Sequence, residues 1–147
     1  MMSALQTLVD NGLSDVALDA ILADLFVSDS FEDDDDRRMC VALAWYRGNE
    51  GRADPDTCHV HRDNVIKVDC AKYLVLDDSE ADSAFDDYLE SMLDDEGMVP
   101  GADGPYFNRE AWKKDASVDG RGVLSGEDGE EQEYDADGDW WYLYRTN

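Results

Sequence analysis

The chain has little positive charge and no long apolar run. Its 147 residues include 12 Lys and Arg against 37 Asp and Glu, which gives a formal net charge of −25. Phosphate backbones and anionic membranes repel such a chain, which argues against direct nucleic-acid binding and membrane attachment. The longest apolar block, Val41–Tyr46, is far shorter than a membrane span. We therefore expect a cytoplasmic protein whose partner presents a basic surface.

Cysteine is scarce, and the three cysteines at positions 40, 58 and 70 have no repeating spacing. An odd number of cysteines without a signal peptide indicates free thiols in a reducing compartment. The segment Cys58–His61 carries thiol and imidazole groups, which are zinc ligands, but a structural zinc site needs a second close ligand pair and the chain offers none. We therefore expect an ordinary loop at this segment and no bound metal.

Motifs for catalysis are also missing. The two histidines lie two residues apart, and no G-x-S-x-G sequence is present. The segment from Asp135 to Asp139 resembles the opening of a calcium loop, but its glycine is fourth instead of sixth. A hairpin turn explains the same residues. We predict that the protein is not an enzyme and needs no cofactor.

The sequence does contain enough apolar material for a core, with 43% hydrophobic residues that include four Trp, seven Tyr and four Phe. Apolar periodicity and capping residues predict an α+β fold. Residues 1–52 are predicted to form an N-terminal helical module of three short helices, and residues 53–147 an α+β domain. In that domain a small antiparallel sheet of three to five strands packs against an acidic helix and a helix over 107–116. A linker is expected over residues 48–63.

A β-hairpin is predicted near residue 138, because Asp137-Gly138 is a signal for a two-residue type I′ turn. The turn sets four cross-strand pairs, which are Asp135–Trp140, Tyr134–Trp141, Glu133–Tyr142 and Gln132–Leu143. Aromatic side chains then lie on both faces of the hairpin. We expect either that both faces are covered or that one presents an aromatic ridge to a partner.

The segment with the largest excess of negative charge is the predicted helix over Asp77–Glu96, which holds ten carboxylates and no Lys or Arg. Its apolar residues follow helical spacing and predict one buried stripe, made of Ala81, Ala84, Phe85, Tyr88, Leu89, Met92 and Leu93. Asp78 or Ser79 is the expected N-cap. Like charges four residues apart repel, so a helix selected only for stability would also contain Lys. The basic cluster within residues 109–114 is the expected clamp for neighbouring acids.

From residue 73 onward the chain resembles a family of uncharacterised accessory proteins encoded by tailed phages and prophages. The resemblance rests on an ordered series of motifs, which are YLVLDDSEAD at 73–82, PYFNREAWKKDASVDGRG at 105–122, GEDGEE at 126–131 and WYLYRTN at 141–147. It implies a phage-encoded, intracellular, non-structural protein and brings no catalytic residues with it. By charge and origin the chain is also similar to acidic anti-CRISPR and anti-restriction inhibitors that mimic DNA.

We therefore hypothesise a phage-encoded inhibitor that acts in the infected host cell on a defence nuclease complex, as an anti-CRISPR. Its carboxylates would take the place of phosphates on the basic DNA-binding surface of that complex. The predicted contacts are Asp78, Glu80, Asp82, Asp86, Asp87, Glu90, Asp94, Asp95, Asp33, Asp34, Asp35 and Asp36. Replacing four helix acids, residues 82, 86, 87 and 90, with Lys is predicted to abolish inhibition and to leave the fold intact.

The alternative is a halophilic or solubilised acidic accessory or structural protein without a mimic role. Asp outnumbers Glu by 27 to 10, and the acids occur in every segment of the chain. Such dispersed acidity fits salt adaptation as well as mimicry. The sequence pattern favours no particular oligomeric state.

Overall fold

The computed structural model describes residues 3–12, 15–94, 104, 106–116 and 120–146. The helices are α1 Ala4–Asn11, α2 Asp15–Ser28, α3 Asp34–Asn49, α4 Asp78–Asp94 and α5 Arg109–Ala116, with short 3₁₀ turns η1 Pro55–Thr57 and η3 Arg121–Leu124. The strands are β1 Cys58–Arg62, β2 Val65–Val68, β3 Ala71–Asp77, β4 Gln132–Ala136 and β5 Asp139–Arg145. The predicted α+β class is confirmed.

The five strands form one antiparallel sheet in the order β1-β2-β3-β5-β4. Strand β1 lies inside the predicted linker, so the loop predicted at Cys58–His61 is wrong. The strand escaped prediction because the Gly and Pro residues that precede it indicated a linker, although Cys58, His59, Val60 and His61 alternate between apolar and polar. It lies at the sheet edge, where only Cys58 is buried and the next four residues are exposed.

The predicted hairpin is confirmed, including its register. Strands β4 and β5 pair Asp135 with Trp140 and Tyr134 with Trp141, and the two pairs that follow also match. Asp137 and Gly138 have φ values of 56° and 91°, as a type I′ turn requires. Most of both faces of β5 is covered, because Trp141 packs in one hydrophobic core and Tyr144 in another, while Trp140 beside the turn is 48% exposed.

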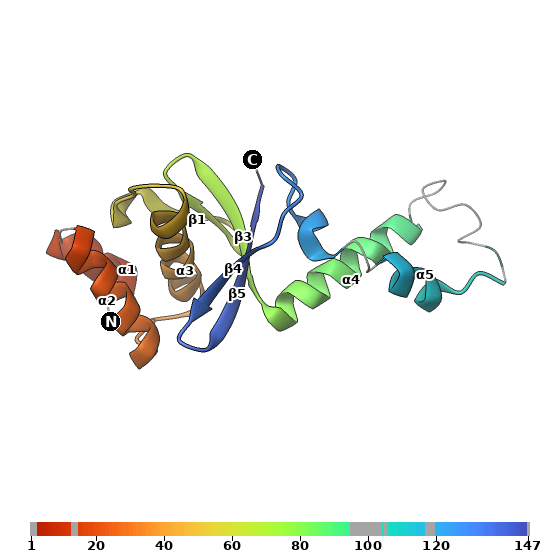
Figure 1. The fold of residues 1–147 in the computed structure, drawn as a ribbon, viewed down its shortest axis with the longest axis horizontal. Coiled ribbons are helices and arrows are strands. Elements are labelled where there is room, and N and C mark those ends of the chain that lie inside the picture. The colour runs from red at the N-terminus through yellow and green to blue at the C-terminus, as the bar shows by residue number, and fades with distance from the viewer. Residues whose placement is uncertain (1–2, 13–14, 95–103, 105, 117–119, 147) are drawn as a thin grey trace.

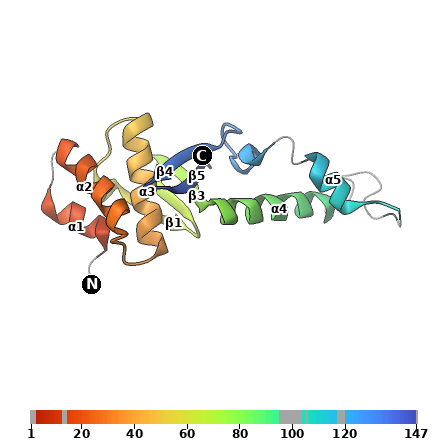
Figure 2. The same cartoon turned by 60° about the horizontal axis from the view of Figure 1, so that its bottom comes forward.

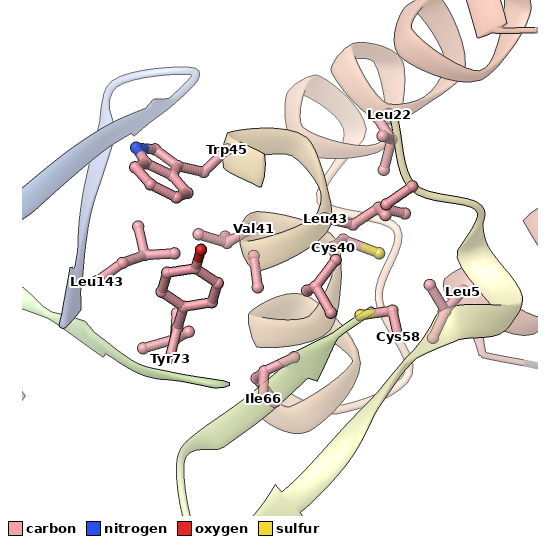
Figure 3. Packing of buried hydrophobic residues seen from close by; sticks show 14 of the residues in the cluster. Leu5, Leu22, Cys40, Val41, Leu43, Trp45, Cys58, Ile66, Tyr73 and Leu143 are labelled. Carbon is pink, nitrogen blue, oxygen red and sulfur yellow. The ribbon is translucent and has the colours of Figure 1, made fainter. Parts of the chain in front are cut away.

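The larger core lies between one face of the sheet and helix α3, with α1 and α2 packed on the outer side of α3 (Figure 1). Figure 3 shows Val41 and Trp45 of α3 pointing at Tyr73 and Leu143 of the sheet. The rings of Trp45 and Tyr73 lie edge to face with centroids 5.3 Å apart. This core joins residues on both sides of the predicted boundary at 52 and 53, so helices and sheet are buried against each other.

The smaller core lies on the other face of the sheet, where the first turns of α4 contact β3 and β5. Leu76, Tyr144 and Ala81 are its buried members. Beyond these turns α4 extends away from the sheet, and α5 lies beside its far half (Figure 2). The predicted packing of the acidic helix on the sheet is therefore confirmed for its beginning, while the rest of α4 forms an arm with α5.

Candidate functional site

Helix α4 begins with a reciprocal cap one residue earlier than predicted. The Asp77 carboxylate accepts a hydrogen bond from the Glu80 backbone N–H at 2.8 Å, and the Glu80 carboxylate accepts one from the Asp77 N–H at 3.1 Å. This is a capping box, which satisfies two helix-terminal donors at once. The guanidinium of Arg38, a buried residue of α3, also donates to Glu80. Glu80, a predicted partner contact, therefore has a structural role of its own.

Arg121 of η3 holds the acids on the first turns of α4. Its guanidinium donates to Asp78 at 3.0 Å, to Asp82 at 2.9 Å and to Glu131 at 2.8 Å. It also lies over the ring of Tyr142, 4.4 Å from the ring centroid, which adds a cation–π contact. Arg121 thus ties η3, α4 and the sheet together.

Helix α5 clamps the far half of α4, as its basic residues predicted. Lys113 donates to Asp86 at 3.0 Å and to Glu90 at 2.7 Å. Arg109 donates to Glu90 at 2.7 Å and to Asp94 at 3.0 Å. The hydrogen bonds from Lys113 and Arg109 lower the pKa of Glu90 below its ordinary value. Six of the seven described carboxylates of α4, which are all predicted partner contacts, are therefore already in ion pairs within the chain.

The charge of α4 is reduced by these pairs but not cancelled. Its described residues carry seven carboxylates, which share four cations, namely Arg38, Arg109, Lys113 and Arg121. Asp87 is exposed and has no ion pair among the described residues. Asp95 lies outside the described residues. The helix therefore keeps a net negative charge whose positions are fixed by ion pairs.

The four aspartates before α3 do not form the uniform acidic patch that the sequence predicted. Asp33 is the N-cap of α3 and accepts from the Asp36 N–H at 2.7 Å. Asp36 is only 1% exposed, and it accepts from the N–H groups of Ala4 at 2.7 Å, Leu5 at 3.1 Å and Glu32 at 3.0 Å. Asp36 therefore caps α1 from across the fold and cannot contact a partner. Asp33, Asp34 and Asp35 are exposed, so Asp36 is the member of the run that is withdrawn from the surface.

The thiols and imidazoles do not converge. Cys58 is buried, while His59 and His61 are exposed on β1, and the described residues contain no group of three metal-binding side chains. Burial raises the pKa of the Cys58 thiol to about 12 and raises that of Cys40 as well. Both thiols are therefore protonated and shielded near neutral pH.

We expect alkylation to distinguish these cysteines. With iodoacetamide near pH 8, the native protein should gain one label, at exposed Cys70, and the denatured protein should gain three. Intact mass spectrometry counts the labels, and peptide mapping locates them. Fast labelling of Cys40 or Cys58 in the native protein would contradict the burial of these thiols.

Comparison of the chain with protein-family models, curated proteins and solved structures finds no match. Within the part of the chain that the structure describes, no helix is both long and apolar enough to cross a membrane.

The position of Arg121 depends on a tight backbone contact beside it. A Cβ atom on Gly122 would lie 2.3 Å from the carbonyl oxygen of Gly129, closer than packing allows. We expect Gly122→Ala to cost roughly 1–3 kcal/mol of unfolding free energy, as overpacking does. Gly126→Ala is the matched control, because a Cβ there meets nothing within 4 Å. Thermal melts of both variants test this, and equal melting temperatures would refute the steric reason.

Proposed function

We propose that the protein is a phage-encoded acidic inhibitor of the anti-CRISPR type, which occupies the DNA-binding surface of a host defence nuclease complex by imitating the charge of nucleic acid. The observation that supports this proposal is the arm formed by α4 and α5, which extends away from the sheet with seven carboxylates on α4 (Figure 2). A partner with a basic groove can receive such an arm without contacting the rest of the molecule.

The ion pairs on the arm support mimicry because they hold the carboxylates in place and still leave acceptor positions for a partner. Asp78, Asp82, Asp86 and Asp94 each give one oxygen, Oδ1, to a cation of the chain. A carboxylate has two oxygens and about four acceptor positions, so each can still accept from a partner's Lys or Arg. Holding the side chains in place beforehand lowers the entropy that is lost on binding.

The spacing of these acids is compatible with that of phosphates. Carboxylates one helical turn apart are separated by about 5–6 Å along the helix axis, while phosphates of one DNA strand recur at about 3.4 Å of axial rise and lie further apart along the backbone path. Lys and Arg side chains are long and flexible enough to span this difference. The proposed mechanism is competition: the arm pairs with the cations that otherwise hold DNA, and charge steering speeds the encounter.

The test is a pull-down from a defence-proficient host lysate at low salt, followed by competition with DNA for the captured complex. We expect the affinity to fall steeply between about 50 and 200 mM salt, and DNA to displace the protein. An affinity that stays flat over this range, or a complex that binds DNA and the protein together, would refute mimicry.

The halophilic alternative makes a different prediction for the protein alone. A fold adapted to high salt needs high salt to overcome self-repulsion, whereas the mimic must fold in dilute buffer because it acts in an ordinary host cell. Circular dichroism melts in dilute buffer separate the two cases. A cooperative transition supports the inhibitor, and an unfolded chain supports salt adaptation.

A further inference from the structure

A groove of about 490 Å³ lies where the turn between β4 and β5 meets the beginning of α4 (Figure 1). It is lined by residues of β5 and of the junction between β3 and α4, chiefly Asp139, Trp140, Tyr142, Asp77, Asp78 and Ser79. Of the four tryptophans, all of which lie in the described part of the chain, only Trp140 is exposed, at 48%. We call this feature the Trp140 groove.

The exposure of Trp140 follows from the place where β3 ends. Alternate residues of β5 lie on one face of the sheet, so Trp140, Tyr142 and Tyr144 share the face on which α4 packs. Tyr144 is fully buried there, and Tyr142 is partly buried. The last paired residue of β3 is Asp77, which lies opposite Trp141, so no strand residue lies beside Trp140 on that side. One aromatic ring of this face is therefore left open, next to the first residue of α4.

The chain itself shows how this face of the sheet binds a guanidinium group. Arg121 lies over the ring of Tyr142, 4.4 Å from its centroid, and donates to Oδ1 of Asp78 at 3.0 Å. A guanidinium group is planar, so it can stack on an aromatic ring while its N–H groups donate to a carboxylate at the side. Two residues along β5, the Trp140 groove offers a second ring with carboxylates beside it.

The electrostatics of the groove favour a cation. Asp139 is exposed, lines the groove and has no ion pair within the described part of the chain. Arg37 lines the groove as well, but its guanidinium is paired with Asp29 and lies over the ring of Phe31. Among aromatic side chains, Trp attracts a cation to its face most strongly. The ring of Trp140 and the carboxylate of Asp139 are therefore available together.

We propose that the Trp140 groove receives an arginine side chain of the partner protein. Its guanidinium stacks on Trp140 and donates to Asp139 and to the oxygen of Asp78 that Arg121 does not use. A lysine ammonium is a compact point charge and lacks the flat face for stacking. The identity of the partner rests on the proposed function, because a DNA-binding surface presents arginines. The arm then supplies long-range charge, and the groove supplies a specific anchor of the Trp and Arg type that dominates many interfaces.

A titration with N-acetyl-arginine amide tests the groove without a host partner. In a ¹⁵N–¹H correlation spectrum the four tryptophans give four indole N–H signals, and Trp140→Tyr identifies the signal of Trp140 by removing it. We expect this signal to shift and to saturate as the arginine derivative is added, while the signal of buried Trp45 stays in place. N-acetyl-lysine amide at the same ionic strength should bind about two- to fivefold more weakly, the size of a cation–π contact at an exposed site.

The carboxylate has its own variant and matched control in the same titration. Asp139→Asn should weaken binding of the arginine derivative by about two- to fivefold, as the loss of an exposed ion pair does. Asp24→Asn on α2 removes the same charge at an exposed site away from the groove and should leave the titration unchanged. Equal effects of the two variants would mean that only net charge attracts the probe.

Surface plasmon resonance against the captured host complex tests whether the groove is part of the interface. Trp140→Leu removes the ring but no charge, so the affinity should fall about 30-fold or more, as at a hot spot, with the salt dependence as steep as that of the wild type. Trp140→Tyr keeps an aromatic face and should lose less than about fivefold. Val27→Ala on α2, where Val27 is 66% exposed, is the control and should bind like the wild type.

Three outcomes would overturn the arginine site. The first is an indole signal of Trp140 that stays in place or never saturates. The second is equal binding of the arginine and lysine derivatives, which indicates attraction by charge without stacking. The third is a Trp140→Leu variant that binds the host complex as tightly as the wild type. A wild-type protein that captures no complex refutes the proposed inhibition instead, and the titration then decides the groove by itself.

Discussion

Replacing Asp36 with Ala is expected to lower the free energy of unfolding by about 3–5 kcal/mol. The carboxylate is buried and accepts three backbone hydrogen bonds, from Ala4 and Leu5 of α1 and from Glu32. Each buried donor left without a partner costs about 1–3 kcal/mol. Helix α1 has no acid in its first turn, so Asp36 also supplies the negative charge at its positive end. Urea denaturation followed by circular dichroism measures the loss.

The matched control for this prediction is Asp34→Ala, which removes the same charge two residues earlier. Asp34 is exposed in the first turn of α3, so its loss should cost only about 0.3–1 kcal/mol, the size of a helix-dipole interaction. Asp36→Asn is the second variant, since an amide keeps the shape but turns one acceptor into a donor that faces backbone N–H groups. If Asp36→Asn were as stable as the wild type, the three hydrogen bonds that the carboxylate accepts would not explain its contribution to stability.

Neutralising the outer face of α4 is expected to weaken binding to the host complex by at least about 100-fold, through the loss of several charge contacts. The variant carries amides in place of four acids, which are Asp82, Asp86, Asp87 and Glu90. Amides are chosen over lysines because Asp82 contacts Arg121 and Asp86 contacts Lys113. Lysines there would repel these cations and detach α5 and η3, so lost inhibition would not separate charge from folding.

The control for the amide variant removes the same charge elsewhere. It carries amides at four exposed acids away from the outer face of α4, which are Asp24, Asp54, Asp56 and Glu133. Surface plasmon resonance against the captured complex compares the two variants at one salt concentration. Equal losses of affinity would mean that only net charge matters, and an unchanged affinity in the α4 variant would move the contact to another surface.

Much of the fold could be predicted from local features of the sequence. The pair Asp137-Gly138 determines a turn type, and that turn determines which residues of β4 and β5 are partners. The buried stripe of α4 follows from helical spacing, with Ala81, Phe85 and Leu89 buried as predicted, whereas Tyr88 at the edge of the predicted stripe is exposed. These features depend on neighbours in the chain, which is why the pattern alone was sufficient.

The candidate site was much less predictable, because its contacts join residues far apart in the sequence. Arg121 binds Asp78 across 43 positions, and Asp36 binds Ala4 across 32. No local sequence pattern indicates which of the many Asp and Glu residues form ion pairs with the few Lys and Arg residues. The pairing of Lys67 with Lys72 was missed for the same reason, since it exists only once β2 and β3 are paired. Nothing in the run of four consecutive aspartates indicates that its last member, Asp36, caps a different helix.

The junction at Asp77 has a mechanical consequence. This residue ends β3 and also caps α4, so no loop separates the strand from the helix. Strand β3 is the middle strand of the sheet, with β2 on one side and β5 on the other. A force on the far end of α4 would therefore be transmitted directly to the central strand of the sheet. A partner that binds the arm would therefore also fix the orientation of the sheet and of the helices packed on it, because no hinge lies between β3 and α4.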